Sequence, residues 1–150
     1  MAEAVEKVPA ETRWAIATQG LTGAVVATGK ALLDAVGQDR YNEITVQIWA
    51  EAGKAAKQVA DALGLVGDDV RSAAETTLSV TAVAMGPEVK SEIVEATAER
   101  AVLRITECPF WNRMKESGIS EDMCSASSVA YADAFAKLKL ASSPAGGGVG

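Results

Sequence analysis

Histidine is absent from all 150 residues of the chain. Without it, a single chain cannot form the Ser-His-Asp or Cys-His systems that activate a nucleophile, nor any zinc site that uses a histidine ligand. Acid–base chemistry would have to come from Asp, Glu, Lys, Tyr or Cys side chains. This absence is the most restrictive feature of the composition.

Long apolar runs and an excess of basic residues are also lacking. No stretch approaches the roughly 18 consecutive apolar residues of a membrane-spanning helix, and the N-terminus lacks the basic and apolar segments of a secretory signal. The formal net charge is −6, whereas a nucleic-acid-binding protein usually presents a basic face. Only two cysteines occur, too few for a disulfide framework. We expect a cytoplasmic protein with reduced thiols that binds neither membranes nor nucleic acids.

Few aromatic residues, many alanines and a length suited to one domain favour closely packed helices around a single core. In the first segment Trp14, Ala17, Leu21 and Val25 recur at three- and four-residue steps, which is the period of a helix. Similar stripes follow twice more, and each segment ends at a glycine. The three predicted helices are 10–36 before Gly37, about 39–63 before Gly64, and a helix opened by Gly67-Asp68-Asp69 that continues to 85 before Gly86-Pro87.

From 89 to 106 the pattern changes to the alternation typical of β-strands. β-Branched residues and the flanking Pro87 and Pro109 favour an antiparallel hairpin that turns near 97–100, although a helix remains an alternative on propensity alone. A lone hairpin is marginally stable in water, so it must pack on the helices or pair with another chain.

The C-terminal part predicts two further helices. A short helix is expected over 109–117, and Ser120 is placed to cap a last helix. The polar segment 1–9 and the Gly/Ser-rich segment 141–150 lack folding signals and are expected to be flexible. The predicted fold is therefore a single, predominantly helical α+β domain over 10–140, with three long helices, one antiparallel β-hairpin and two C-terminal helices.

Both cysteines lie near predicted helix N-termini. Cys108 comes directly before the helix opened by Pro109, and Cys124 falls in the first turns of the helix opened by Ser120. The positive end of a helix dipole favours a thiolate. Three neighbouring carboxylates oppose it, and the sequence alone does not decide between the two effects: Glu107, Glu121 and Asp122.

Three interpretations of the cysteines remain open. Both thiols are inert and buried, as free cysteine often is. Alternatively, a reactive or ligand-contacting cysteine lies in a small pocket with Trp111, Tyr131 and a carboxylate, where the hairpin meets the last helix. The third interpretation is a metal site, which would need two more ligands from Asp, Glu or a symmetry mate because the cysteines lack the close spacing of zinc motifs.

The order of elements, the run Arg104-x-x-x-Cys108-Pro109 and the position of Cys124 at the final helix resemble the L-2-amino-thiazoline-4-carboxylic acid hydrolase family over roughly residues 42–138. A weaker likeness exists to the 4-vinyl reductase small-molecule-binding domains, which also keep cysteines after a hairpin. The first resemblance implies hydrolytic opening of a small cyclic C–N/C–S ring in an amino-acid analogue. It also implies that Cys108 and Cys124 are the residues carried over.

We therefore expect a small-molecule hydrolase in which Cys108 is the nucleophile or ligand anchor and Cys124 its partner, with Trp111 and Tyr131 contacting substrate. Arg104 could hold a substrate carboxylate through two parallel hydrogen bonds, or could be an ordinary solvated charge on a strand. The alternative is a non-catalytic module that binds a small molecule, cofactor or metal through the cysteines and dimerises through its Ala- and Gly-rich helices. The sequence specifies no cofactor, and a homo-oligomer is expected.

Overall fold

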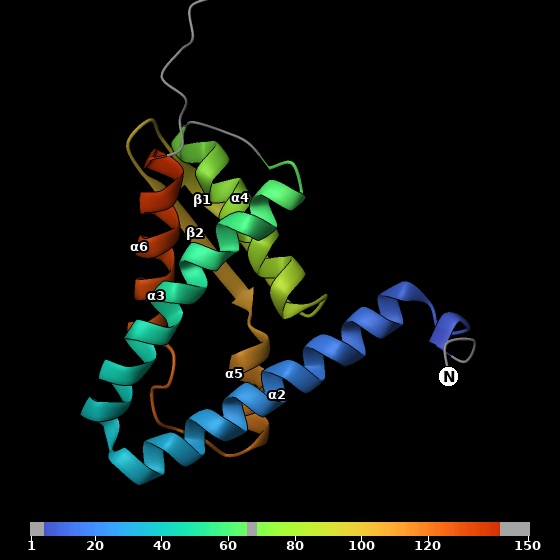
Figure 1. The fold of residues 1–150 in the computed structure, drawn as a ribbon, viewed down its shortest axis with the longest axis vertical. Coiled ribbons are helices and arrows are strands. Elements are labelled where there is room, and N and C mark those ends of the chain that lie inside the picture. Colours follow the sequence, from blue (N-terminus) through green and yellow to red (C-terminus); the bar gives the residue numbers. More distant parts are fainter. Residues whose placement is uncertain (1–4, 66–68, 142–150) are drawn as a thin grey trace, which may run out of the picture.

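The computed structural model describes residues 5–65 and 69–141, without the side chains of residues 57 and 135–141. Helices and one two-stranded sheet make up this part of the chain (Figure 1), and the predominantly helical α+β class predicted from the sequence is confirmed. The elements in chain order are α2 (Ala10–Val36), α3 (Gln38–Ala62), α4 (Val70–Met85), β1 (Lys90–Ala96), β2 (Ala101–Glu107), α5 (Pro109–Glu116) and α6 (Ser125–Ala141).

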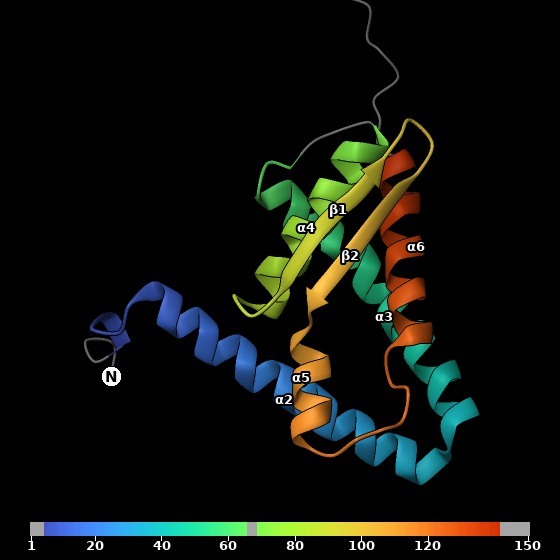
Figure 2. The same cartoon turned by 180° about the vertical axis from the view of Figure 1, so that it is seen from behind.

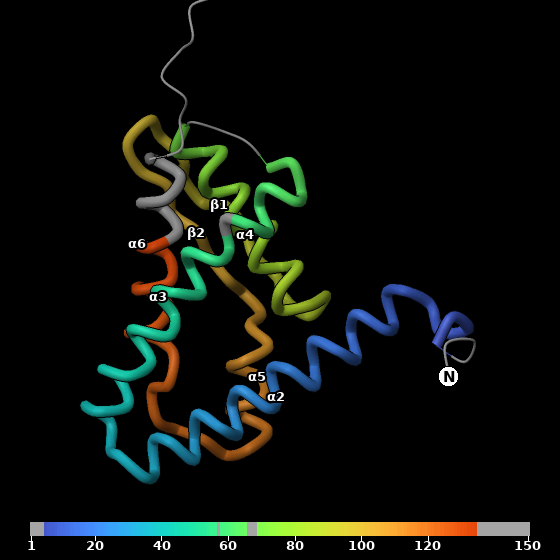
Figure 3. Tube along the Cα trace, viewed as in Figure 1, coloured from blue at the N-terminus to red at the C-terminus, as the bar shows by residue number. Residues whose placement is uncertain are grey.

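Glycines end the long helices where the sequence predicted. Gly37 adopts φ +77 between α2 and α3, a conformation that L-residues with a Cβ rarely adopt, and the two helices leave it in a V (Figure 3). Gly86 ends α4 with φ +94, and a Cβ at this position would overlap the Thr18 hydroxyl on α2. Two constraints therefore favour glycine at position 86: the positive φ angle of its backbone and the close approach of α4 to α2.

Aspartate side chains hold the starts of α4 and α6. The Asp69 carboxylate accepts a hydrogen bond from the Ser72 backbone N–H at 2.7 Å and caps α4. The predicted partners of Asp69 in opening this helix, Gly67 and Asp68, lie outside the described residues.

The prediction that Ser120 caps the last helix is wrong, because α6 begins at Ser125. Asp122 Oδ1 accepts hydrogen bonds from the backbone N–H groups of Cys124 and Ser125 at 3.0 and 2.9 Å, which satisfies the donors that a helix start leaves free. The chain before Asp122 stays irregular and buries Ile119 in the core. Of the predicted flexible tail 141–150, Ala141 ends α6 and the rest lies outside the described residues.

The predicted hairpin is confirmed. β1 and β2 pair antiparallel with Ile93 opposite Leu103 and Ser91 opposite Ile105, and the register shifts between Ile93 and Glu95. At the turn, Thr97 Oγ1 accepts from the backbone N–H of Arg100 at 3.0 Å. Figure 2 shows the hairpin lying over α4, with α6 along its other side. The hairpin thus gains the support that an isolated one lacks.

The buried face of α2 differs from its most apolar stripe. Leu21 is 57% exposed, whereas the helix buries Thr18, Thr22, Val26 and Leu33. The Thr22 hydroxyl donates to the carbonyl of Thr18 at 2.9 Å, so the helix backbone itself satisfies this buried polar side chain. The buried threonine side chains are small and form hydrogen bonds within α2, so neighbouring segments can approach this face closely. The larger apolar Leu21 lies on a different, exposed face of the helix.

Two clusters of buried side chains form the core. One joins α3 to α4 and consists of Ala56, Ala60 and Val80. The other lies where α2 and α3 meet α5 and the loop before α6, and consists of Val26, Leu33, Tyr41, Met114, Ile119 and Met123. The second cluster contains two of the three methionines that the structure describes.

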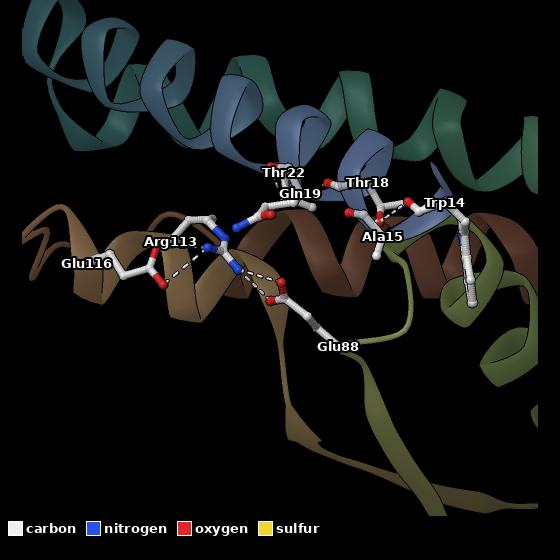
Figure 4. A network of polar contacts seen from close by, with 8 residues as sticks. All are labelled: Trp14, Ala15, Thr18, Gln19, Thr22, Glu88, Arg113 and Glu116. Atoms are coloured by element: carbon white, nitrogen blue, oxygen red, sulfur yellow. Dashed lines mark hydrogen bonds and ion pairs between the residues drawn. The ribbon is translucent and has the colours of Figure 1, made fainter. Parts of the chain in front are cut away.

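An ion pair between Arg113 on α5 and Glu88 links the second core cluster to the hairpin. Arg113 Nη2 donates to both carboxylate oxygens of Glu88, at 2.7 and 2.5 Å, and Nη1 donates to Glu116 at 2.8 Å (Figure 4). The Arg113 side chain is only 14% exposed, and its Nε is buried without a hydrogen-bond partner among the described residues. Glu88 lies two residues before β1, so this ion pair fixes the start of the hairpin against α5.

Replacing this arginine should cost far more stability than replacing a surface one. For Arg113→Met we expect a loss of roughly 1–3 kcal/mol, because Glu88 would keep a half-buried charge without its partner. Arg104→Met is the matched control, since Arg104 pairs with Glu92 at 2.9 Å with both side chains more than half exposed, and it should cost less than about 1 kcal/mol. Urea unfolding measures both, and equal losses would contradict this role for Arg113.

Candidate functional site

A cavity of about 250 Å³ lies between the hairpin, α4, α6 and the second core cluster. Its apolar walls come from the side chains of Val25, Val26, Trp49, Leu78, Ala84, Met85, Leu103, Ile105, Phe110, Met114, Met123 and Ala132. Its polar lining consists of hydroxyl and thiol groups, from Tyr41, Thr77, Thr81, Cys108, Cys124, Ser127, Ser128 and Tyr131. No Asp, Glu, Lys or Arg is among the lining residues in the part of the chain that the structure describes.

The fold brings the two cysteines to this one cavity. Cys108 follows the last residue of β2 and, in an extended conformation, is the N-cap of α5. Cys124 precedes α6, where the side chain of Asp122 holds its backbone N–H. Both cysteines are half-buried free thiols, and Cys124 Sγ lies 3.9 Å from Met114 Sδ. Two thiols from separate helix starts therefore share one apolar space.

Burial controls the ionisation of Cys124. It raises the pKa of this thiol to about 11, and the nearby charges of Cys108 and Asp122 act in the same direction. At Cys124, therefore, desolvation is the dominant effect and disfavours the thiolate, despite the nearby helix N-terminus. At neutral pH this thiol is protonated, and it is a weak nucleophile in that form.

Three aromatic rings form one wall of the cavity. The Trp49 ring packs edge-on against Phe110, with centroids 5.7 Å apart, and against Tyr131 at 6.3 Å. Burial raises the pKa of Tyr131, and a hydrogen bond with Thr81 acts in the opposite direction. The wall therefore presents ring faces and a neutral hydroxyl.

A second tyrosine, Tyr41, also lines the cavity. The Tyr41 hydroxyl donates to the Met123 carbonyl at 3.2 Å, and burial raises its pKa as well. Like Tyr131 and Cys124, it is uncharged at neutral pH. No Asp, Glu, Lys or Arg side chain accompanies these three groups among the described lining residues.

Two of the residues considered from the sequence lie outside this cavity. Arg104 Nη1 bonds to Glu92 at 2.9 Å on the exposed side of the hairpin, because Leu103 and Ile105 on either side of it face the cavity and neighbouring strand residues point to opposite faces. Trp111 is 52% exposed, and Lys115 Nζ lies 5.5 Å from the centroid of its ring.

Phe110, which precedes Trp111, lines the cavity where Trp111 was expected. Phe110 and Met114 are one helical turn apart and both line the cavity, whereas Trp111 is exposed and is not among the lining residues. Sequence reasoning missed Phe110, although its spacing from Met114 after the opening Pro109 was the available signal. The carboxylate expected in the pocket is also not found among the described lining residues.

Comparison of the chain with models of known protein families, with curated proteins and with solved structures finds no match. In the part of the chain that is described, no group of three or more His, Cys, Asp or Glu residues is placed to hold a metal ion. None of the helices in residues 5–65 and 69–141 has both the length and the apolar character needed to cross a membrane. The resemblance to thiazoline-carboxylate hydrolases stays a prediction.

The raised pKa of Cys124 should make stability fall at alkaline pH. An unfolded cysteine ionises near pH 9.0 and the folded one near 11, so above pH 9 ionisation stabilises the unfolded state first. We expect the free energy of unfolding to fall by about 1–2 kcal/mol more in the wild type than in Cys124→Ala between pH 8.5 and 11, allowing for partial exposure. Urea unfolding across this range measures the difference. Ser128→Ala, which removes a lining hydroxyl instead, should keep the wild-type slope, and parallel curves for all three proteins would refute the assignment.

Proposed function

We propose that this chain binds a small, uncharged and largely apolar molecule in the cavity between the hairpin and α6. The observation that carries this proposal is the lining of the cavity, in which hydroxyl and thiol groups interrupt an apolar wall and no Asp, Glu, Lys or Arg occurs among the described residues. Binding pockets for small molecules are commonly apolar, with a few polar groups that fix orientation. Burying a charged ligand here would be unfavourable, because no opposite charge is available among the described lining residues.

Cavity size narrows the class of ligand. An engineered apolar cavity of about 150 Å³ accepts benzene, so about 250 Å³ suits a bicyclic ring such as indole. The Trp49 and Phe110 rings would stack edge-on or offset against such a ring. Tyr131 and Thr81 supply hydroxyls for one polar group on the ligand.

Hydrolysis of a small cyclic C–N/C–S substrate is the second candidate. One observation favours it: Cys108 and Cys124 line the same cavity, with Cys108 at the start of α5. We rank it below binding for two reasons. The Cys124 thiol is protonated at neutral pH, with a pKa of about 11, and Arg104, the candidate for holding a substrate carboxylate, lies outside the cavity.

The cytoplasm is the proposed location of the protein. Both thiols are free, and cysteines stay reduced in that compartment.

Methionine methyl groups offer a direct test of binding. In protein labelled with ¹³C at the methionine methyls, indole should shift the Met114 signal saturably, whereas indole-3-carboxylate should bind at least about tenfold more weakly because its charge would be buried. Ala84→Phe, which places a ring in the cavity, should abolish the indole effect. Val83→Phe changes the neighbouring position, which is 44% exposed and outside the lining, and should leave it intact.

Two outcomes would overturn this ranking. Equal binding of indole-3-carboxylate, or no saturable shift at Met114, would reject an uncharged ligand. Turnover of 2-aminothiazoline-4-carboxylate by the wild type, lost in Cys108→Ser with folding unchanged, would place the hydrolase first.

We also propose that copies of the chain associate through α2, one of the Ala- and Gly-rich helices. Residues 14–29 contain no charged side chain, yet Leu21 and Ile16 are 57% and 62% exposed. Exposed helix surface usually carries charge, and a contiguous apolar patch favours an interface. Two copies related by a twofold axis would cover the same surface on each other.

Charge placed on α2 should therefore dissociate the assembly. Leu21→Glu is expected to shift the mass measured by light scattering after size-exclusion chromatography from oligomer to monomer, because a carboxylate would be buried without a partner. Ala31→Glu puts the same charge on the same helix beyond the uncharged stretch and should leave the mass unchanged. A wild type that is already monomeric at high micromolar concentration would reject association.

A further inference from the structure

Every cysteine and methionine that the structure describes lines the same cavity. These residues are Met85, Cys108, Met114, Met123 and Cys124, and they come from α4, the end of β2, α5 and the loop before α6. Apolar side chains of other kinds are spread over two core clusters and the surface. The sulfur atoms are therefore concentrated in one place, although they are distant in the sequence.

One pair of these residues has a sulfur–sulfur distance that two ligands of one ion would have. Cys124 Sγ and Met114 Sδ are 3.9 Å apart. Two sulfurs bound to a d¹⁰ metal at about 2.3 Å, with an angle between 110° and 120°, would be about 3.8–4.0 Å apart. Met114 is 1% exposed, so packing holds its thioether in place before any ion arrives.

The chemistry of the donors selects the ion. Thiolate and thioether sulfurs favour Cu(I), whereas Mg²⁺, Ca²⁺ and Mn²⁺ prefer carboxylate and carbonyl oxygens. No carboxylate lines the cavity in the described chain, and histidine is absent from the whole sequence. Cys108 lines the same space from the N-cap of α5 and is the candidate for a third sulfur ligand, a number that would suit the low coordination number of a monovalent soft ion.

We propose that Cys124, Met114 and Cys108 form a binding site for Cu(I). On binding, each coordinating thiol loses its proton to solvent as its sulfur bonds to the ion, and the oxidation state of copper does not change. The resulting dithiolate complex carries a net negative charge; the copper–sulfur bonds must offset the desolvation that keeps the free Cys124 thiol protonated, and the N-termini of α5 and α6 beside the two cysteines add favourable dipoles. This site uses the sulfur-lined part of the cavity and does not depend on the binding of an organic ligand.

Competition with a Cu(I) chelator tests the site. The probe is Cu(I) held as its coloured bicinchoninate complex, titrated with reduced wild-type protein under anaerobic conditions. We expect removal of one equivalent of copper, with Cys124→Ser weakening the affinity at least about a hundredfold. Met114→Leu, which conserves volume and apolar character, should weaken it about tenfold.

Val83→Leu is the control, because Val83 lies on α4, is 44% exposed and is not among the lining residues; its affinity should equal that of the wild type. X-ray absorption at the copper edge should show sulfur ligands alone. Failure of the wild type to take copper from bicinchoninate, equal affinity of Met114→Leu and wild type, or light-atom ligands in the absorption spectrum would each overturn the proposal. The indole titration contains no metal, so the two proposals fail independently.

Discussion

The ion pair of Arg113 with Glu88 is the constraint on which the site depends. A two-stranded sheet is marginal by itself, and this hairpin is fixed near both ends, at Glu88 before β1 and at the start of α5 after β2. The guanidinium is nearly buried and makes two bonds to one carboxylate, which sets orientation as well as distance. With the hairpin held in this way, Leu103 and Ile105 face α4 and α6, and a cavity remains between them.

Burial decides the chemistry of that cavity. Burial raises the pKa values of Cys124, Tyr41 and Tyr131, so these three groups stay uncharged at neutral pH and serve as hydrogen-bonding or soft-donor groups more readily than as acids and bases. A soft metal ion is compatible with such thiols because it displaces their protons. An uncharged ring is compatible because it needs no opposite charge. Both proposals follow from one feature of the cavity: apolar walls carry thiol, thioether and hydroxyl groups, and no Asp, Glu, Lys or Arg is among the described lining residues.

Local signals in the sequence predicted most of the elements. Gly37 and Gly86 mark helix ends because their backbone conformations are difficult for other residues, and the alternation after Pro87 reveals the hairpin. The start of α6 was placed too early because Ser120 and Asp122 are both good caps, and only the bonds from Asp122 to Cys124 and Ser125 choose between them. Trp111 was predicted to contact substrate, but it is exposed, and the neighbouring Phe110 lines the cavity instead.

The sequence by itself determined the class of fold, the helix and strand boundaries near glycine and proline, and the lack of histidine chemistry, because each depends on residues close together in the chain. Only the tertiary structure decided which face of α2 is buried, which thiol is desolvated and that the sulfurs of Cys108, Met114 and Cys124 share one cavity. Those outcomes depend on contacts between segments far apart in the sequence. Periodicity shows which residues share a face of a helix, but packing decides what that face meets.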